Sequence, residues 1–158
     1  LVLGLGNTIM TDDGFGVKVV TTLSSRYHFH GSVKLIDGGT LGLDLLPELE
    51  ELDSLLIIDA LDMRADPGGI FRLEGEDVPR AFASKLSVHQ MGLQDLLAVA
   101  EFQGHAPRNL VVWGVQPECI EMGTELTATV EATVEPVIEK VLQELKAWGI
   151  GYEQREDP

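Results

Sequence analysis

The sequence predicts an α/β protein, a three-layer α/β/α sandwich built on a five-stranded, mostly parallel twisted sheet with one antiparallel edge strand. Three observations predict this fold. Short apolar runs of strand length alternate with longer segments in which apolar residues recur at helical spacing. One of the runs, Ser54–Ile58, is apolar at nearly every position, as parallel strands buried on both faces are. The length of 158 residues suits one domain, which we expect to span 1–158.

The first half of the chain predicts strands and helices in alternation. Each strand is a short apolar run closed by glycine or polar residues, and each helix follows a polar loop. In chain order, the expected elements are a strand at Leu1–Gly6, a helix from Phe15 to Leu23, a strand at Ser32–Ile36 closed by Asp37–Thr40, a helix over Leu43–Leu52 and a strand at Ser54–Ile58.

The fourth strand, Gly69–Leu73, breaks this alternation. Only a polar loop containing Pro67 separates it from Asp59, and such a loop is too short for the crossover helix that parallel pairing requires. We therefore expect this strand to be antiparallel and to lie at an edge of the sheet.

The second half of the chain completes the sandwich. Ser87–Gln90 has the spacing of a capping box and predicts the start of a helix with His89 in its first turn. Leu110–Val115 predicts a fifth strand, and apolar residues from Val130 to Trp148 predict one long final helix. We expect the polar tail, 151–158, to be frayed.

Composition excludes several classes of function. With 26 acidic and 11 basic residues the net charge is −15, which disfavours binding to nucleic acid or to an anionic membrane. The single cysteine excludes an internal disulfide and a thiolate zinc cage. The sequence holds no apolar run long enough to span a bilayer and no signal-peptide pattern, so we expect a soluble cytoplasmic protein with a few residues upstream of Leu1.

Polar residues follow most of the expected strands, at the edge of the sheet where ligands bind in open α/β folds. They are Asn7, Asp12, Asp13, Asp37, Thr40, Asp59, Asp62 and Gln116, with His89 within reach of the same edge. Carboxylates and an imidazole suit a divalent metal such as nickel or zinc. Asp13, Asp59 and His89 are the preferred ligands.

Each of these residues also has a purely structural explanation. Asp12 and Asp13 suit the start of a helix, Asp59 could close a turn, and His89 could be a solvated residue of a first helical turn. A pair of histidines in the sequence His28-Phe29-His30 could bind a metal, but a solvated helix end explains it better. Cys119 is expected to be a small buried or semi-buried thiol.

A dinucleotide-binding reading of the first loop fails in detail. Gly4 and Gly6 follow an expected strand, but Ile9 stands where the third glycine of the GxGxxG motif belongs, and Asp12 and Asp13 would repel a pyrophosphate. The chain also lacks the motifs GxxxxGK[ST], HExxH and GxSxG. P-loop NTPases, zincin-type proteases and serine hydrolases are thereby disfavoured.

Five separated segments, in this order along the chain, resemble the hydrogenase maturation endopeptidases. They are GLGNTIMTDDGFGV at Gly4–Val17, DGGT at Asp37–Thr40, IIDA at Ile57–Ala60, SVHQMGL at Ser87–Leu93 and GVQPE at Gly114–Glu118. The resemblance runs from Leu1 to about Trp148.

This resemblance implies an α/β endopeptidase that removes a C-terminal extension from the large-subunit precursor of a nickel-iron hydrogenase after nickel insertion. By the motifs, Asp13, Asp59 and His89 would be the metal ligands, and Asp37 matches a further characteristic acidic position near the cleft. Some relatives have glutamate where this chain has the shorter Asp13. The nickel would be presented by the precursor.

Two points stay open at the level of sequence. The water that attacks the peptide bond could be activated by a carboxylate acting as a general base or by the metal. The same three residues would also serve a non-catalytic nickel-binding chaperone that docks on the precursor, and only peptide-bond cleavage separates the two. A nucleotide-binding domain would instead bind NAD or ATP without depending on Asp13.

Overall fold

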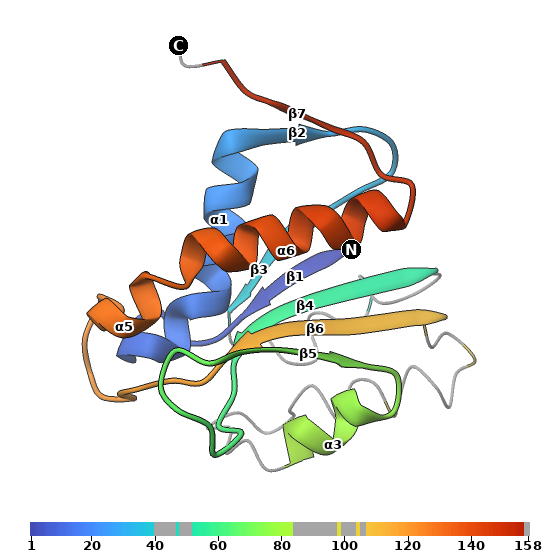
Figure 1. Cartoon of the computed structure of the whole chain (residues 1–158). Coiled ribbons are helices and arrows are strands. Elements are labelled where there is room, and N and C mark those ends of the chain that lie inside the picture. The colour runs from blue at the N-terminus through green and yellow to red at the C-terminus, as the bar shows by residue number, and fades with distance from the viewer. Residues whose placement is uncertain (40–46, 48–51, 84–97, 99–103, 105–106, 157–158) are drawn as a thin grey trace.

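The computed structural model describes residues 1–39, 47, 52–83, 98, 104 and 107–156. It confirms the predicted fold class, with a five-stranded sheet in the order β3-β1-β4-β6-β5 and helices around it (Figure 1). The sheet strands are β1 (Val2–Leu5), β3 (Leu35–Gly39), β4 (Ser54–Ala60), β5 (Ile70–Glu74) and β6 (Asn109–Val115). The remaining elements are the 3-10 turn η1 (Thr11–Gly14), α1 (Phe15–Arg26), β2 (Tyr27–Phe29), α3 (Asp77–Ala83), α5 (Ala128–Glu131), α6 (Val134–Ala147) and β7 (Tyr152–Gln154).

Four strands of the sheet are parallel and the fifth is antiparallel. Strand β1 pairs in parallel with both β3 and β4, and β4 pairs in parallel with β6. Strand β5 pairs antiparallel with β6 at the edge, as the short loop before it predicts. The carboxyl ends of β3, β1, β4 and β6 therefore meet at one edge of the sheet.

Two apolar clusters fill the layers on either side of the sheet. On one face α1 and α6 pack on the strands, with Phe15, Leu23 and Leu145 fully buried among them. On the other face α3 covers the strands and buries Val78 against Leu55 and their neighbours. Figure 1 shows α1 and α6 on one side of the strands and α3 on the other.

Two strands extend further toward the carboxyl edge than the sequence predicts. Strand β4 continues to Ala60, so Asp59 lies inside the strand and not in a turn after it. Strand β3 begins at Leu35 and includes the segment Asp37-Gly38-Gly39, which was expected to close it. Both extensions follow from pairing, because Asp59 aligns with Gly114 on β6 and Gly39 aligns with Leu5 on β1.

The final helix is divided, contrary to the prediction of one continuous helix. It consists of α5 and α6, which are separated at Ala132 and Thr133. Pro136 explains the break, since its ring nitrogen has no hydrogen to donate to the carbonyl of Ala132 and proline is tolerated in the first turn of a helix. The short helix α3 has no counterpart among the elements expected from the sequence.

The expectation of a frayed tail is wrong for Tyr152–Gln154. These residues form β7 and pair antiparallel with β2, which directly follows α1. The rings of Tyr27 and Tyr152 meet edge to face, with centroids 5.4 Å apart. Beyond the strand, the Arg155 N–H donates to the Arg26 carbonyl at 2.7 Å. The tail is thereby attached to the end of α1.

Two expected helices fall mainly on residues outside the described ranges, namely the one over Leu43–Leu52 and the one that starts near Ser87. Within the described ranges, the longest helix has 14 residues, and none is both long and apolar enough to cross a membrane.

Candidate functional site

Gly6, the residue after β1, lies close to two of the predicted site residues, Asp13 and Asp59. Its N–H donates to the Gly39 carbonyl at 3.1 Å, and its φ of +122° is a conformation that favours glycine. A Cβ on Gly6 would lie 1.7 Å from the Asp13 carbonyl oxygen and 3.5 Å from Asp59 Oδ1. The turn that carries Asp13 and the strand that carries Asp59 therefore approach each other across a backbone with no side chain.

Asp13 is half-buried in η1, and the preceding loop orders its carboxylate. The Asn7 N–H donates to Asp13 Oδ2 at 2.9 Å. The same asparagine accepts two bonds within the loop, from Ile9 N–H at its side-chain oxygen and from Met10 N–H at its carbonyl. This side chain–to–backbone pattern is a turn that asparagine favours. Asn7 thus stabilises the loop and also orients the carboxylate of Asp13.

Asp59 is a buried carboxylate within β4, with an exposed fraction of 1%. Its Oδ1 accepts the Ala60 N–H at 2.9 Å. On the neighbouring strand β6 it faces Gly114, and a Cβ there would lie 3.2 Å from the Asp59 carbonyl. A carboxylate is costly to bury unless hydrogen bonds or a cation compensate for lost hydration, so such a residue at a ligand-binding edge is a candidate for function.

Asp37 lies on the other side of β1 from Asp59. It is exposed on β3 and is level with Gly4, which is in turn level with Ile58, the residue before Asp59. The segments that carry Asp13, Asp37 and Asp59 therefore meet at one edge of the sheet, around the end of β1. The fourth predicted residue, His89, lies outside the described residues, as does Thr40. Within the described residues, no three histidine, cysteine or acidic side chains are grouped closely enough to hold a metal.

Asp12 has a role that its position in the sequence does not indicate. The expectation that it caps a helix is wrong, because α1 has no side-chain cap and Asp12 is fully buried. Its carboxylate accepts the N–H groups of Glu118, Cys119 and Thr127 at 2.9, 3.0 and 2.8 Å, and also the Thr127 hydroxyl. Asp12 therefore fastens the segment 118–127 to the turn that carries Asp13.

We expect Asp12→Asn to lower the free energy of unfolding by about 2–4 kcal/mol, because an amide has one acceptor oxygen and leaves buried N–H groups without a partner. Urea denaturation measures this loss. Asp53→Asn is the matched control, since Asp53 is exposed just before β4 and the change should stay within about 0.5 kcal/mol. Equal stability of the two variants would contradict a fastening role for Asp12.

Gln116 and Asp62, both predicted near the edge, order the loop that follows β4. Gln116 is buried, and its Oε1 accepts the N–H groups of Met63 and Ala65 at 2.7 and 3.1 Å. Its Nε2 donates to Asp62 Oδ1 at 3.0 Å. Hydrogen bonds from the Arg64 N–H and then from Gln116 lower the pKa of the Asp62 carboxyl. Gln116 and Asp62 therefore stabilise each other and the loop through these hydrogen bonds.

The remaining candidate residues are His28 and His30, which contact neighbouring residues away from the carboxyl edge of the sheet, and Cys119, which is a free thiol. His28 lies in β2 rather than at a helix end, and its ring contacts that of His30 edge to face at 5.8 Å. His30 Nε2 is 3.8 Å from Glu153 on β7. Cys119 is a half-buried free thiol, as predicted.

Comparison with known proteins connects this geometry to one family. The sequence model of the family described as hydrogenase maturation protease matches residues 17–144. Hydrogenase 2 maturation protease from Escherichia coli is 42% identical over 157 residues, which cover 99% of this chain and 96% of the relative. The hydrogenase expression/formation protein HupD of Rhodobacter capsulatus is 40% identical over 152 residues, covering 95% of this chain and 72% of the relative.

Solved structures give the same result. The hydrogenase maturating endopeptidase HybD from E. coli superimposes with a TM-score of 0.94 at 41% identity, covering 99% of this chain and 98% of the other. A hydrogenase maturation protease HybD from Thermococcus kodakarensis gives a TM-score of 0.70 at 27% identity, covering 90% and 96% of the two chains. Both solved structures therefore share the fold of this chain over nearly its whole length, including the sheet edge that carries Asp13 and Asp59.

Proposed function

Because this chain belongs to the hydrogenase maturation protease family, we propose that it cleaves a C-terminal extension from a nickel-loaded large-subunit precursor, with Asp13, Asp59 and His89 recognising the nickel. The protein is a peptidase that processes the large-subunit precursor of a hydrogenase. The observation that carries the proposed site is that the backbone of Asp13 and the carboxylate of Asp59 both lie close to Gly6.

The donor chemistry of these residues suits nickel carried by a substrate. Two carboxylates and an imidazole offer oxygen and nitrogen ligands, which borderline divalent metals accept. Each carboxylate has a first hydrogen bond that orients it, from Asn7 N–H to Asp13 and from Ala60 N–H to Asp59. A carboxylate oriented in this way loses little side-chain conformational entropy when it binds a cation. The fold therefore lowers the entropy cost of recognising the metal.

Nickel recognition would position the scissile bond beside the carboxylates. In the cleavage, a water oxygen attacks the scissile carbonyl carbon and gives one proton to a carboxylate of the edge. The C–N bond then breaks, and the carboxylic acid returns the proton to the leaving amine. Asp37 is exposed at this edge and is the candidate for that base. The proposed enzyme is therefore an aspartic-type peptidase in the sense that cleavage depends on carboxylates, with the metal as an alternative means of activating the water.

The intact mass of a matching large-subunit precursor tests this proposal. The precursor is incubated with the protein before and after nickel insertion, and its mass is compared with that of an untreated sample. Loss of one defined C-terminal peptide from the nickel-loaded form alone is the expected result. An unchanged mass with binding still detected would overturn the endopeptidase assignment in favour of a nickel-binding chaperone. Equal cleavage of both forms would overturn nickel recognition.

A further inference from the structure

Two loops beside the proposed site are joined into one rigid surface. The segment 9–11 and the segment 119–123 form a parallel bridge at Met10 and Gly123, in which Gly123 N–H donates to the Ile9 carbonyl and Thr11 N–H to the Gly123 carbonyl, both at 2.9 Å. The Thr11 hydroxyl adds bonds with the Cys119 carbonyl and the Glu121 N–H. Asp12 also connects these two loops, because its carboxylate accepts the N–H groups of Glu118 and Cys119. The surface is therefore preorganised and continuous with Asp13.

This surface exposes large apolar side chains. Ile9 is 54% exposed, Met122 is 85% exposed and Ile120 is 46% exposed. Ile9 and Met122 directly precede the two bridged residues, so the bridge between Met10 and Gly123 brings their backbones close together. Apolar side chains held in the open by a hydrogen-bonded framework are typical of a protein–protein contact.

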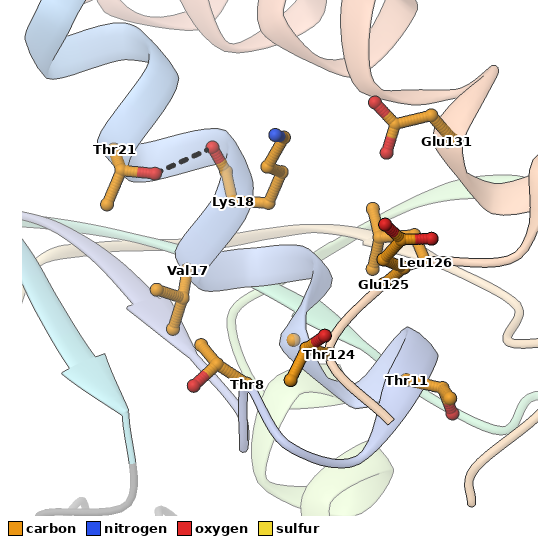
Figure 2. Close-up of a pocket in the computed structure, with 10 residues that line it drawn as sticks. Thr8, Thr11, Val17, Lys18, Thr21, Thr124, Glu125, Leu126 and Glu131 are labelled. Atoms are coloured by element: carbon orange, nitrogen blue, oxygen red, sulfur yellow. Dashed lines mark hydrogen bonds between the residues drawn. The ribbon is translucent and has the colours of Figure 1, made fainter. Parts of the chain in front are cut away.

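A pocket of about 430 Å³ opens beside the bridge, between the first loop, α1 and the segment 124–131. Figure 2 shows Thr8 and Thr11 on one side of it, Lys18 on α1, and Glu125 and Glu131 from the later segment. Its two glutamates are exposed and, within the described residues, form no salt bridge. The segment 117–127 contains three glutamates and no lysine or arginine. The surroundings of the apolar surface are thus acidic.

We propose that Ile9, Ile120 and Met122, with the acidic pocket beside them, form the docking surface for the precursor, and that they bind an apolar segment of it that carries a basic residue. The inference rests on the proposed function, because the occupant is the substrate of that site. Continuity with the turn that carries Asp13 selects the substrate as occupant, and the glutamates favour a basic residue over an acidic one.

Steady-state cleavage of nickel-loaded precursor tests this surface. The double variant Ile9→Ser/Met122→Ser should raise KM at least about 10-fold and leave kcat within about 2-fold, since truncating central apolar contacts weakens docking without touching the carboxylates. Glu125→Lys should also raise KM, and added salt should weaken docking of the wild type more than that of the variant. Tyr152→Ser is the control, because Tyr152 is also exposed and apolar, at 37%, but lies on β7.

Each outcome decides between explanations. Unchanged KM in the double variant, with the wild type cleaving normally, overturns the docking surface and leaves the proposed function standing. Absence of cleavage by the wild type overturns the proposed function itself. Sedimentation of the free protein gives a further readout. A wild-type dimer that the double variant converts to monomer would show that the surface binds a second copy of this chain, which would also overturn the proposal.

Discussion

Asp59→Asn is expected to reduce processing of nickel-loaded precursor at least about 10³-fold while the protein stays folded. Asparagine has nearly the same shape and keeps one oxygen to accept the Ala60 N–H, which Asp59 Oδ1 accepts in the structure. The change removes the negative charge and directs an NH₂ group where a cation would bind. His89→Ala should have an effect of similar size, because it deletes the proposed nitrogen ligand.

Initial cleavage rates measure this loss, and the mass of the precursor reports the extent of cleavage at each time. Asp66→Asn is the matched control, since Asp66 is an exposed aspartate in the loop after β4 and should leave the rate unchanged. Thermal unfolding of each variant establishes that the fold survives. Wild-type rates in folded Asp59→Asn protein would contradict the role of this carboxylate in the site.

Gly16→Ala is expected to destabilise the whole domain, by more than about 3 kcal/mol, although alanine normally favours a helix over glycine. Gly16 lies in the first turn of α1, where the helix touches the sheet. An added Cβ would lie 2.0 Å from the Ile58 carbonyl oxygen and 2.5 Å from that of Leu5. Both obstacles are backbone of central strands, so α1 would have to move away from β1 and β4.

Chemical denaturation and yield of soluble protein measure this effect. Ser24→Ala provides the control, because Ser24 is exposed on the same helix and alanine there should keep or slightly raise the stability. A Gly16→Ala protein as stable as the wild type would mean that α1 does not depend on this close approach. The approach is reciprocal, since a Cβ on Gly4 would lie 2.4 Å from the Gly16 carbonyl oxygen.

Local patterns in the sequence predict most of the sheet. Apolar runs place β1, β4 and β6, and the short loop before Ile70 predicts that β5 is antiparallel. The rule that ligands bind at the carboxyl ends of parallel strands leads to Asp13 and Asp59 without any motif. The apolar patterns and the polar residues that follow each strand both involve residues that are close together in the chain, so a single sequence shows them.

The features that the sequence does not predict depend on partners far along the chain. Asp12 and Asp13 are adjacent acidic residues with the same local pattern, yet Asp12 is buried by donors more than 100 residues away, whereas Asp13 is half-buried and accepts an N–H from Asn7. Strand β7 pairs with β2 across a similar distance, so its polar sequence alone indicates a tail. Long-range pairing decides these positions, and no local propensity reports it.

The hydrogen bonds of Asp12 also imply an order of assembly. Its donors Glu118 and Thr127 are 106 and 115 residues away, so the contacts that fasten the turn carrying Asp13 close long loops and are favoured only after most of the sheet has formed. During synthesis, the amino-terminal strands therefore emerge well before the segment that fixes their edge. Peptidase competence should then arise late, when the last quarter of the chain has been translated and can join the turn made first.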